Sequence, residues 1–260
     1  MRESSAGDLL IFRCEMPRLG EPSGREILNK VKGSVANGLS DIIVDEYEKL
    51  LVARLIDENY GYLASRDRDF LKKKVFLKLN GQDGARVRKS QGPYQRNQRK
   101  SRVWAKLAEY LEGEDEIVLE GFITFRLKEY LEELFNVVDE TVEEHLVERE
   151  YREFLKLLRH FMDRQKSPAS TINIVRQSGG SYQVLDDDFS PIKGEVGTFL
   201  KGSPEGLGLD IDDLVVSAVV TLAPEKVVWH GPKDDSPCFD LLKDLFEERF
   251  AICPGCSLEK

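Results

Sequence analysis

The last part of the chain decides the fold: 214-LVVSAVVTLAPEKVVWHGPKDDSPCFDLLKDLFEERFAICPGC-256. Its apolar pattern predicts a helix over 214–223, a strand over 226–229, an amphipathic helix over 238–246 and a second strand over 250–253. Two strands joined by a helix pair in parallel by default, because the helical crossover returns the chain to the same end of the sheet. We therefore expect both strands to end on one edge.

This edge carries a candidate metal site. Four potential soft ligands belong to it, namely His230 after the first strand, Cys238 near the start of the helix, and Cys253 and Cys256 around the second strand's end. Thiolate and imidazole are zinc ligands, and a C-x-x-C turn can hold the ion from one side. A single C-x-x-C is an incomplete motif. Three states stay open, in this order: structural cysteines without a ligand, a zinc site, and a reversible disulfide. No cofactor is certain, and zinc is the candidate.

Composition describes a globular chain of 260 residues with 41% hydrophobic and 33% charged residues and a net charge of −9. An acidic whole argues against general nucleic-acid binding. The N-terminus does not resemble a signal peptide. The longest nearly apolar run, 214–223, has about half the length that a membrane span needs. We therefore predict a cytoplasmic protein without a membrane span, whose four cysteines form no disulfide framework.

For the whole chain, the sequence predicts an α+β protein with two domains. The first, 1–166, is mainly helical and contains a basic mobile loop at 83–101. The second, 167–260, is a small α/β domain with a mixed sheet, made of a hairpin over 171–185 and the parallel β-α-β unit, and it ends in the C-x-x-C motif.

Helical periodicity predicts the elements of the first domain. Helices are expected over 41–60, capped by Asp41, over 67–79, with Ser65 as the cap, and over 102–111. From 122 to 166 there is neither glycine nor proline, which predicts one amphipathic helix or a pair joined near 136–141. Its apolar stripe continues through Val147, Tyr151, Phe154, Leu158 and Phe161.

A local basic patch interrupts these helices. It contains no acidic residue between its ends and consists of Arg86, Arg88, Lys89, Arg96, Arg99, Lys100 and Arg102, with Tyr94 available to stack on a base. Such a patch can contact phosphates. The alternative is a solvated linker whose positive charge compensates the negative charge of the acidic part of the same molecule. We favour this alternative because no folded nucleic-acid module surrounds the patch.

Four separated motifs carry a family resemblance. They are EGFITFRLKEY at 120–130, LVEREYREFLKLLRHF at 146–161, LVVSAVVTLAPEKVVWHGP at 214–232 and ICPGC at 252–256. Together they resemble the YtxC-like family of sporulation proteins over about 100–256, and the basic loop looks like a variable insertion. The resemblance implies an endospore-forming bacterium and a link to sporulation. It implies no activity, so no catalytic residue is carried over.

Three functions follow, in order of preference. The first is a non-enzymatic protein-interaction or scaffold factor of sporulation with an unknown protein partner. The second is a nucleic-acid-binding protein that uses the basic patch. The third is an enzyme or zinc/thiol protein that uses the rim of His230, Cys253 and Cys256. The enzyme comes last because the sequence offers no nucleophile–base–orienter set and no phosphate-binding glycine loop.

Overall fold

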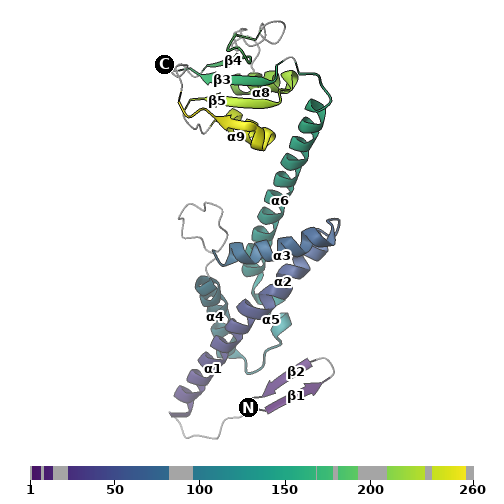
Figure 1. The fold of residues 1–260 in the computed structure, drawn as a ribbon. Coiled ribbons are helices and arrows are strands. Elements are labelled where there is room, and N and C mark those ends of the chain that lie inside the picture. The colour runs from purple at the N-terminus through teal and green to yellow at the C-terminus, as the bar shows by residue number, and fades with distance from the viewer. Residues whose placement is uncertain are drawn as a thin grey trace. The chain divides into compact units, whose positions relative to one another are not determined.

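The computed structural model describes residues 2–6, 9–13, 23–81, 96–167, 169–177, 181–192, 210–231 and 236–255. Helices dominate, and a small mixed sheet lies in the C-terminal part of the sequence (Figure 1). The chain forms two compact units, Met1–Leu146 and Val147–Lys260. This confirms the predicted α+β class. The two units divide inside a long helix, earlier in the chain than the predicted boundary at 166/167.

The first unit is built from helices and one hairpin. The strands β1 (Arg2–Ala6) and β2 (Leu9–Arg13) pair antiparallel. The helices are α1 (Ser23–Ile42), the π-helical segment η1 (Ile43–Tyr47), α2 (Glu48–Asn59), α3 (Ser65–Leu79), α4 (Arg96–Gly113), α5 (Leu119–Arg126) and the first half of α6 (Lys128–Met162). One apolar core joins α1 to α6, with Ile43, Ile56, Leu71, Leu107 and Leu134 almost fully buried in it.

Two predicted helix starts are wrong. The helix expected from Asp41 begins at Ser23, so Asp41 lies inside α1 and its carboxylate binds basic side chains of α4 instead of capping a helix. The helix α3 starts at Ser65 itself, and its N-cap residue Ala64 offers no side-chain bond. For Asp41 the tertiary contacts with α4 replace the capping role that its local sequence suggested, whereas the start of α3 differs from the predicted one by two residues.

The segment η1 adds one residue to the turn that joins α1 and α2. The backbone N–H of Glu48 donates to the carbonyl of Ile43, five residues earlier, which is the hydrogen bond of a π-helix. Ile43, Val44 and Glu48 are buried together in this stretch, whereas Asp45 stays partly accessible. The wider turn therefore places apolar residues and one carboxylate on the inner side of the same continuous helix.

The second unit holds a four-stranded sheet in the order β4-β3-β5-β6. The antiparallel hairpin of β3 (Thr171–Arg176) and β4 (Tyr182–Leu185) confirms the predicted one. The strand β5 (Lys226–His230) pairs parallel with β3 and with β6 (Phe250–Ile252), which confirms the parallel β-α-β unit. The crossovers contain α8 (Ile211–Leu222) and α9 (Pro237–Phe246), followed by the 3₁₀ turn η3 (Glu247–Arg249).

Both helices cover the same face of the sheet. Alternate strand residues Ile172, Ile174, Val227 and Trp229 share one apolar core with side chains of α8 and α9. Two residues of the second half of α6, Leu155 and Met162, belong to this core as well. This packing explains why the compact unit begins within α6 rather than after it.

The helix α6 is unbroken from Lys128 to Met162, so the alternative of a joint near 136–141 does not occur (Figure 1). The interruption falls at Leu127, the residue between α5 and α6, whose side chain is buried in the helical core. Within the described residues, no helix is both long enough and apolar enough to span a membrane.

Candidate functional site

The edge of the sheet has the geometry that the sequence predicts for the backbone. Trp229 of β5 is paired with Ile252 of β6, so His230 and Cys253 are the next residues along these parallel strands. The backbone N–H of Cys253 donates to the carbonyl of Trp229 at 2.8 Å. One candidate imidazole and one candidate thiol therefore leave the sheet at the same edge, on neighbouring strands.

His230 is buried there rather than open to solvent. Its side chain is 4% exposed, and its Nε2 lies 2.9 Å from Oδ1 of Asn173. Asn173 in turn donates from Nδ2 to the carbonyl of Asp186 at 2.8 Å. Sequence reasoning missed Asn173, although a lone amide inside the apolar run TINIVR of β3 signals a satisfied buried polar group.

The remaining metal candidates do not complete a described site. Cys238 is buried in the core of the second unit, and its backbone N–H donates to Oδ2 of Asp212 at 3.4 Å. Cys256 lies outside the described residues. Among the residues that are described, no three His, Cys, Asp or Glu side chains are grouped as metal ligands. The zinc site of Cys253, Cys256, His230 and Cys238 therefore stays a prediction.

The basic patch is divided by the structure. Arg86, Arg88, Lys89 and Tyr94 lie outside the described residues, whereas Arg96, Arg99, Lys100 and Arg102 are part of α4. Residues 96–101 of the predicted loop are thus helical. The reason is tertiary: all four of these basic side chains bind carboxylates on other helices of the same unit.

Arg99 forms a buried polar network. Its guanidinium binds the Glu48 carboxylate through Nε at 2.8 Å and Nη2 at 3.0 Å, and both side chains are only 2% exposed. The third nitrogen, Nη1, donates to the last carbonyl of α3, Leu79, at 2.7 Å. The hydroxyl of Tyr130 on α6 donates to Glu48 at 2.6 Å. The Arg99–Glu48 ion pair, together with its hydrogen bonds to Leu79 and Tyr130, therefore joins α2, α3, α4 and α6.

Burial of this network has an electrostatic consequence for Tyr130. Desolvation and the nearby Glu48 carboxylate raise the pKa of the Tyr130 hydroxyl well above its usual range. The phenol therefore remains a neutral donor to Glu48 at physiological pH. Buried ion pairs need such complete hydrogen bonding, because removing two charges from water costs several kcal/mol each.

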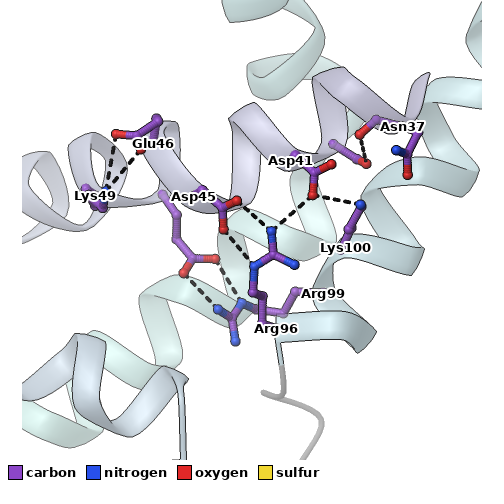
Figure 2. Close-up of polar contacts among 10 residues, drawn as sticks. Asn37, Asp41, Asp45, Glu46, Lys49, Arg96, Arg99 and Lys100 are labelled. Atoms are coloured by element: carbon purple, nitrogen blue, oxygen red, sulfur yellow. Dashed lines mark hydrogen bonds and ion pairs between the residues drawn. The ribbon is translucent and has the colours of Figure 1, made fainter. Parts of the chain in front are cut away.

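A second, more accessible network lies one helical turn away (Figure 2). Arg96 binds Asp45 in a fork, with Nε–Oδ1 at 2.7 Å and Nη2–Oδ2 at 2.5 Å, and its Nη2 also reaches Asp41 at 3.0 Å. Lys100 binds the same Asp41 oxygen at 2.7 Å. The hydrogen bond from Lys100 lowers the pKa of Asp41, and the one from Arg96 lowers the pKa of Asp45.

These contacts change the interpretation of the patch. Arg102 also has a partner, Glu133 of α6. The described half of the basic patch thus holds helices together and is neutralised by carboxylates from α1, η1, α2 and α6. Sequence reasoning missed Asp41, Asp45 and Glu48 as partners. The one available signal was an acidic residue, Glu48, at an inward position of a helix, since buried carboxylates are almost always paired.

An exposed apolar stripe on α6 is the remaining candidate surface. The apolar side chains that share this stripe are partly or largely accessible: Val147 is 60% exposed, Phe154 48%, Leu157 70% and Phe161 56%. Leu155 and Met162, roughly a quarter of a turn further around the same helix, are buried in the core of the second unit. Of the predicted stripe, Val147, Phe154 and Phe161 thus lie on the open surface, which Leu157 extends, whereas Leu158 packs against the core.

Comparison with known proteins agrees with the motifs. The family model of the YtxC-like family matches residues 33–251. The chain belongs to the YtxC-like family. The match begins well before residue 100, so it includes most of α1 and all of α2 to α4 together with the first three motifs, and it ends just before the fourth motif at 252–256. Family membership confirms the resemblance that the sequence carries.

Within the YtxC-like family, the chain is similar to the uncharacterized protein YtxC of Bacillus subtilis (strain 168). The two are 22% identical over 136 residues, which is 52% of this chain and 48% of that protein. The chain therefore spans about half the length of that relative. No solved structure matches the chain.

Proposed function

We propose that this YtxC-like chain is a non-enzymatic, cytoplasmic protein-interaction factor of sporulation that docks a protein partner on the exposed face of α6. The observation that carries the proposal is the stripe of Val147, Phe154, Leu157 and Phe161, whose side chains are about half exposed or more. Exposed apolar patches with polar rims are typical of protein-binding surfaces. The family resemblance supports the link to sporulation.

The helix is well suited to present such a surface. Its inner side is fixed by Leu155 and Met162, and Arg159 anchors it to α9 through bonds to the carbonyls of Leu245 and Asp244 at 2.9 and 2.5 Å. Tyr151 adds a hydrogen bond to Asp244 at 3.1 Å. A rigid helix loses little conformational entropy when a partner binds, which favours docking.

The test is a pair of matched chromosomal substitutions in the bacterium that encodes the chain. Leu157→Lys places a charge in the stripe, and Leu50→Lys places the same charge on an equally open leucine of α2, which is 62% exposed. The proposal predicts fewer heat-resistant spores for Leu157→Lys and a normal yield for Leu50→Lys, with equal protein levels. A normal yield for both variants, or a host that forms no spores, would contradict it.

Zinc binding is the alternative to be checked on the same purified protein. The meeting of His230 and Cys253 at one edge of the sheet supports it. Stoichiometric zinc that a thiol reagent releases, and that Cys253→Ser abolishes, is the result expected of a metal site. Metal-free protein with reactive thiols would remove this alternative.

A further inference from the structure

The open face of α6 has the repeat of a coiled-coil seam. Val147, Glu150, Phe154, Leu157 and Phe161 of α6, and Arg164 in the turn directly after it, follow one another in steps of three, four, three, four and three residues. This is the spacing of the a and d positions of a heptad repeat, which two helices bury against each other. The three apolar positions Phe154, Leu157 and Phe161 are flanked by one charged residue on each side, Glu150 and Arg164, and Val147 lies beyond Glu150.

The two charged residues of the seam, Glu150 and Arg164, have opposite sign, and both can bind a partner. Glu150 and Arg164 are exposed, and neither forms an ion pair with another residue in the part of the chain that the structure describes. Other charges of the same stretch are used locally, for example in the Arg149–Glu153 and Arg152–Glu148 pairs. A partner of this seam must therefore offer an apolar middle, a cation for Glu150 and an anion for Arg164.

A second copy of the same helix, running in the opposite direction, offers all three. We infer that the YtxC-like chain forms a two-fold symmetric dimer through antiparallel pairing of the second half of α6. Phe154 then lies in one layer with Leu157 of the second copy, and Glu150 lies in the layer of Phe161, one layer away from Arg164 of the second copy, which is within reach of these two long side chains. The symmetry produces each contact twice. This inference rests on the proposed function and names the partner of its docking face.

Charge excludes the parallel arrangement of the same two helices. A parallel pair would place Glu150 against Glu150 in one layer and Arg164 against Arg164 in another, and like charges at such short range oppose association. Antiparallel pairing replaces both repulsive contacts by attractive ones. The sequence of the seam therefore selects the direction of the partner as well as its identity.

The size of the seam predicts a weak dimer. Each buried phenylalanine covers roughly 150–250 Å², and Phe154 and Phe161 are about half exposed. The four rings of two copies thus contribute roughly 400 Å², and the neighbouring residues extend the interface towards the lower limit of about 1,000 Å² for specific complexes. We expect a dissociation constant on the order of 10 µM.

The experiment is sedimentation velocity of the full chain from about 1 to about 300 µM, a range that brackets this constant. The wild type is expected to pass from monomer to dimer and to form nothing larger, because a two-fold interface closes on itself. Leu157→Lys should remain monomeric throughout the range, and Leu50→Lys should match the wild type. A monomeric wild type, or growth beyond the dimer, would overturn the inference.

A charge-reversal set tests the direction. Glu150→Arg and Arg164→Glu should each weaken the dimer about tenfold, because each creates two like-charge contacts. The double variant should return to within about threefold of the wild type, since reversing both charges restores two attractive pairs. A double variant as weak as the single ones would refute antiparallel pairing. Circular dichroism of each variant checks that the exposed substitutions leave the fold intact.

The dimer experiment and the spore-yield experiment can contradict the inference and the proposed function independently of each other. A monomeric wild type whose Leu157→Lys variant still lowers spore yield would reject the second copy and leave the docking face with a different protein. A normal dimer whose Leu157→Lys variant sporulates normally would reject the proposed function and leave the self-association.

Discussion

At the scale of single residues, the helical unit depends on one buried guanidinium. Arg99 satisfies the Glu48 carboxylate and the end of α3 at once, in a place from which water is excluded. Arg99→Met should lower the free energy of unfolding by about 3–5 kcal/mol, because it leaves Glu48 buried and unpaired. Urea denaturation measures this change.

The control for this prediction lies on the same helix. Arg102→Met breaks a more exposed pair with Glu133 and should cost no more than about 1 kcal/mol. The double variant Glu48→Met with Arg99→Met should be more stable than Arg99→Met alone, since it removes the orphaned charge. An equal cost for Arg99→Met and Arg102→Met would show that the buried pair is not the element that joins these helices.

The accessible network makes a prediction about pH. Arg96 lowers the pKa of Asp45 below its ordinary value of 3.8 through hydrogen bonding. A carboxyl group with a lowered pKa stabilises the folded state above its unfolded pKa, and this contribution is lost as the pH falls below 3.8 through the folded pKa. In Arg96→Met the pKa of Asp45 should rise towards its ordinary value.

Carbon-13 NMR titration of labelled aspartate carboxyl groups measures that change directly. Asp187 of the second unit, whose pKa is lowered, in spite of desolvation, by hydrogen bonds from the backbone N–H groups of Thr171 and Ser170, serves as the reference in both proteins. The expected result is an upward shift of the Asp45 pKa in the variant and the same Asp187 pKa in both proteins. An Asp45 midpoint that is the same with and without Arg96 would contradict the account of this network.

At the scale of elements, the two sides of α6 predict opposite responses to substitution. Leu155→Ala should lower the free energy of unfolding by about 2–5 kcal/mol, because Leu155 is buried in the core of the second unit. Leu157→Ala, two residues away but 70% exposed, should stay within about 0.5 kcal/mol of the wild type at concentrations where the chain is monomeric. Thermal or urea unfolding compares them.

Similar costs for the two leucines would mean that the open face of α6 is covered in solution by another part of the same chain. That result would remove the surface on which the proposed function rests. Repeating the comparison at high protein concentration adds a second readout, because dimer formation should then stabilise the wild type relative to Leu157→Ala.

The start of α8 provides a prediction about capping. The Asp210 side chain accepts a hydrogen bond from the backbone N–H of Asp212 at 3.3 Å. Asp210→Ala should cost about 0.5–2 kcal/mol, whereas Asp210→Asn, which keeps an acceptor oxygen, should cost less. Equal stability of the two variants would show that this cap contributes nothing measurable.

At the scale of the whole molecule, local patterns predicted the second unit well. Short apolar runs separated by turn residues placed β3, β4, β5 and β6, the hairpin of the first two strands and the parallel pair of the last two. The pairing of β3 with β5, which joins them into one sheet, was not specified. Apolar periodicity also predicted the helical state of α6, although no pattern in the sequence distinguishes apolar residues that face a core from those that stay open.

The helical unit was less predictable for a physical reason. The π-helical turn η1 and the helical state of 96–101 lie where carboxylate–guanidinium pairs join residues about fifty positions apart. Asp45 and Arg96 do not influence each other in the unfolded chain, so neither local propensity nor capping signals contain this information. Only the folded neighbourhood shows that the basic patch has partners.

The central claim is that the open face of α6 pairs with a second copy in the antiparallel direction, and a zero-length cross-link tests it most directly. In an Arg164→Lys variant, a carbodiimide can join the Glu150 carboxylate to the new amine at position 164 only between two chains, since within one chain the helix from Glu150 to Met162 alone separates them by roughly 18 Å. In a mixture of unlabelled and nitrogen-15 chains, we predict a mixed-isotope peptide that joins positions 150 and 164 and disappears with Leu157→Lys. No such peptide at concentrations of about 100 µM would contradict the claim.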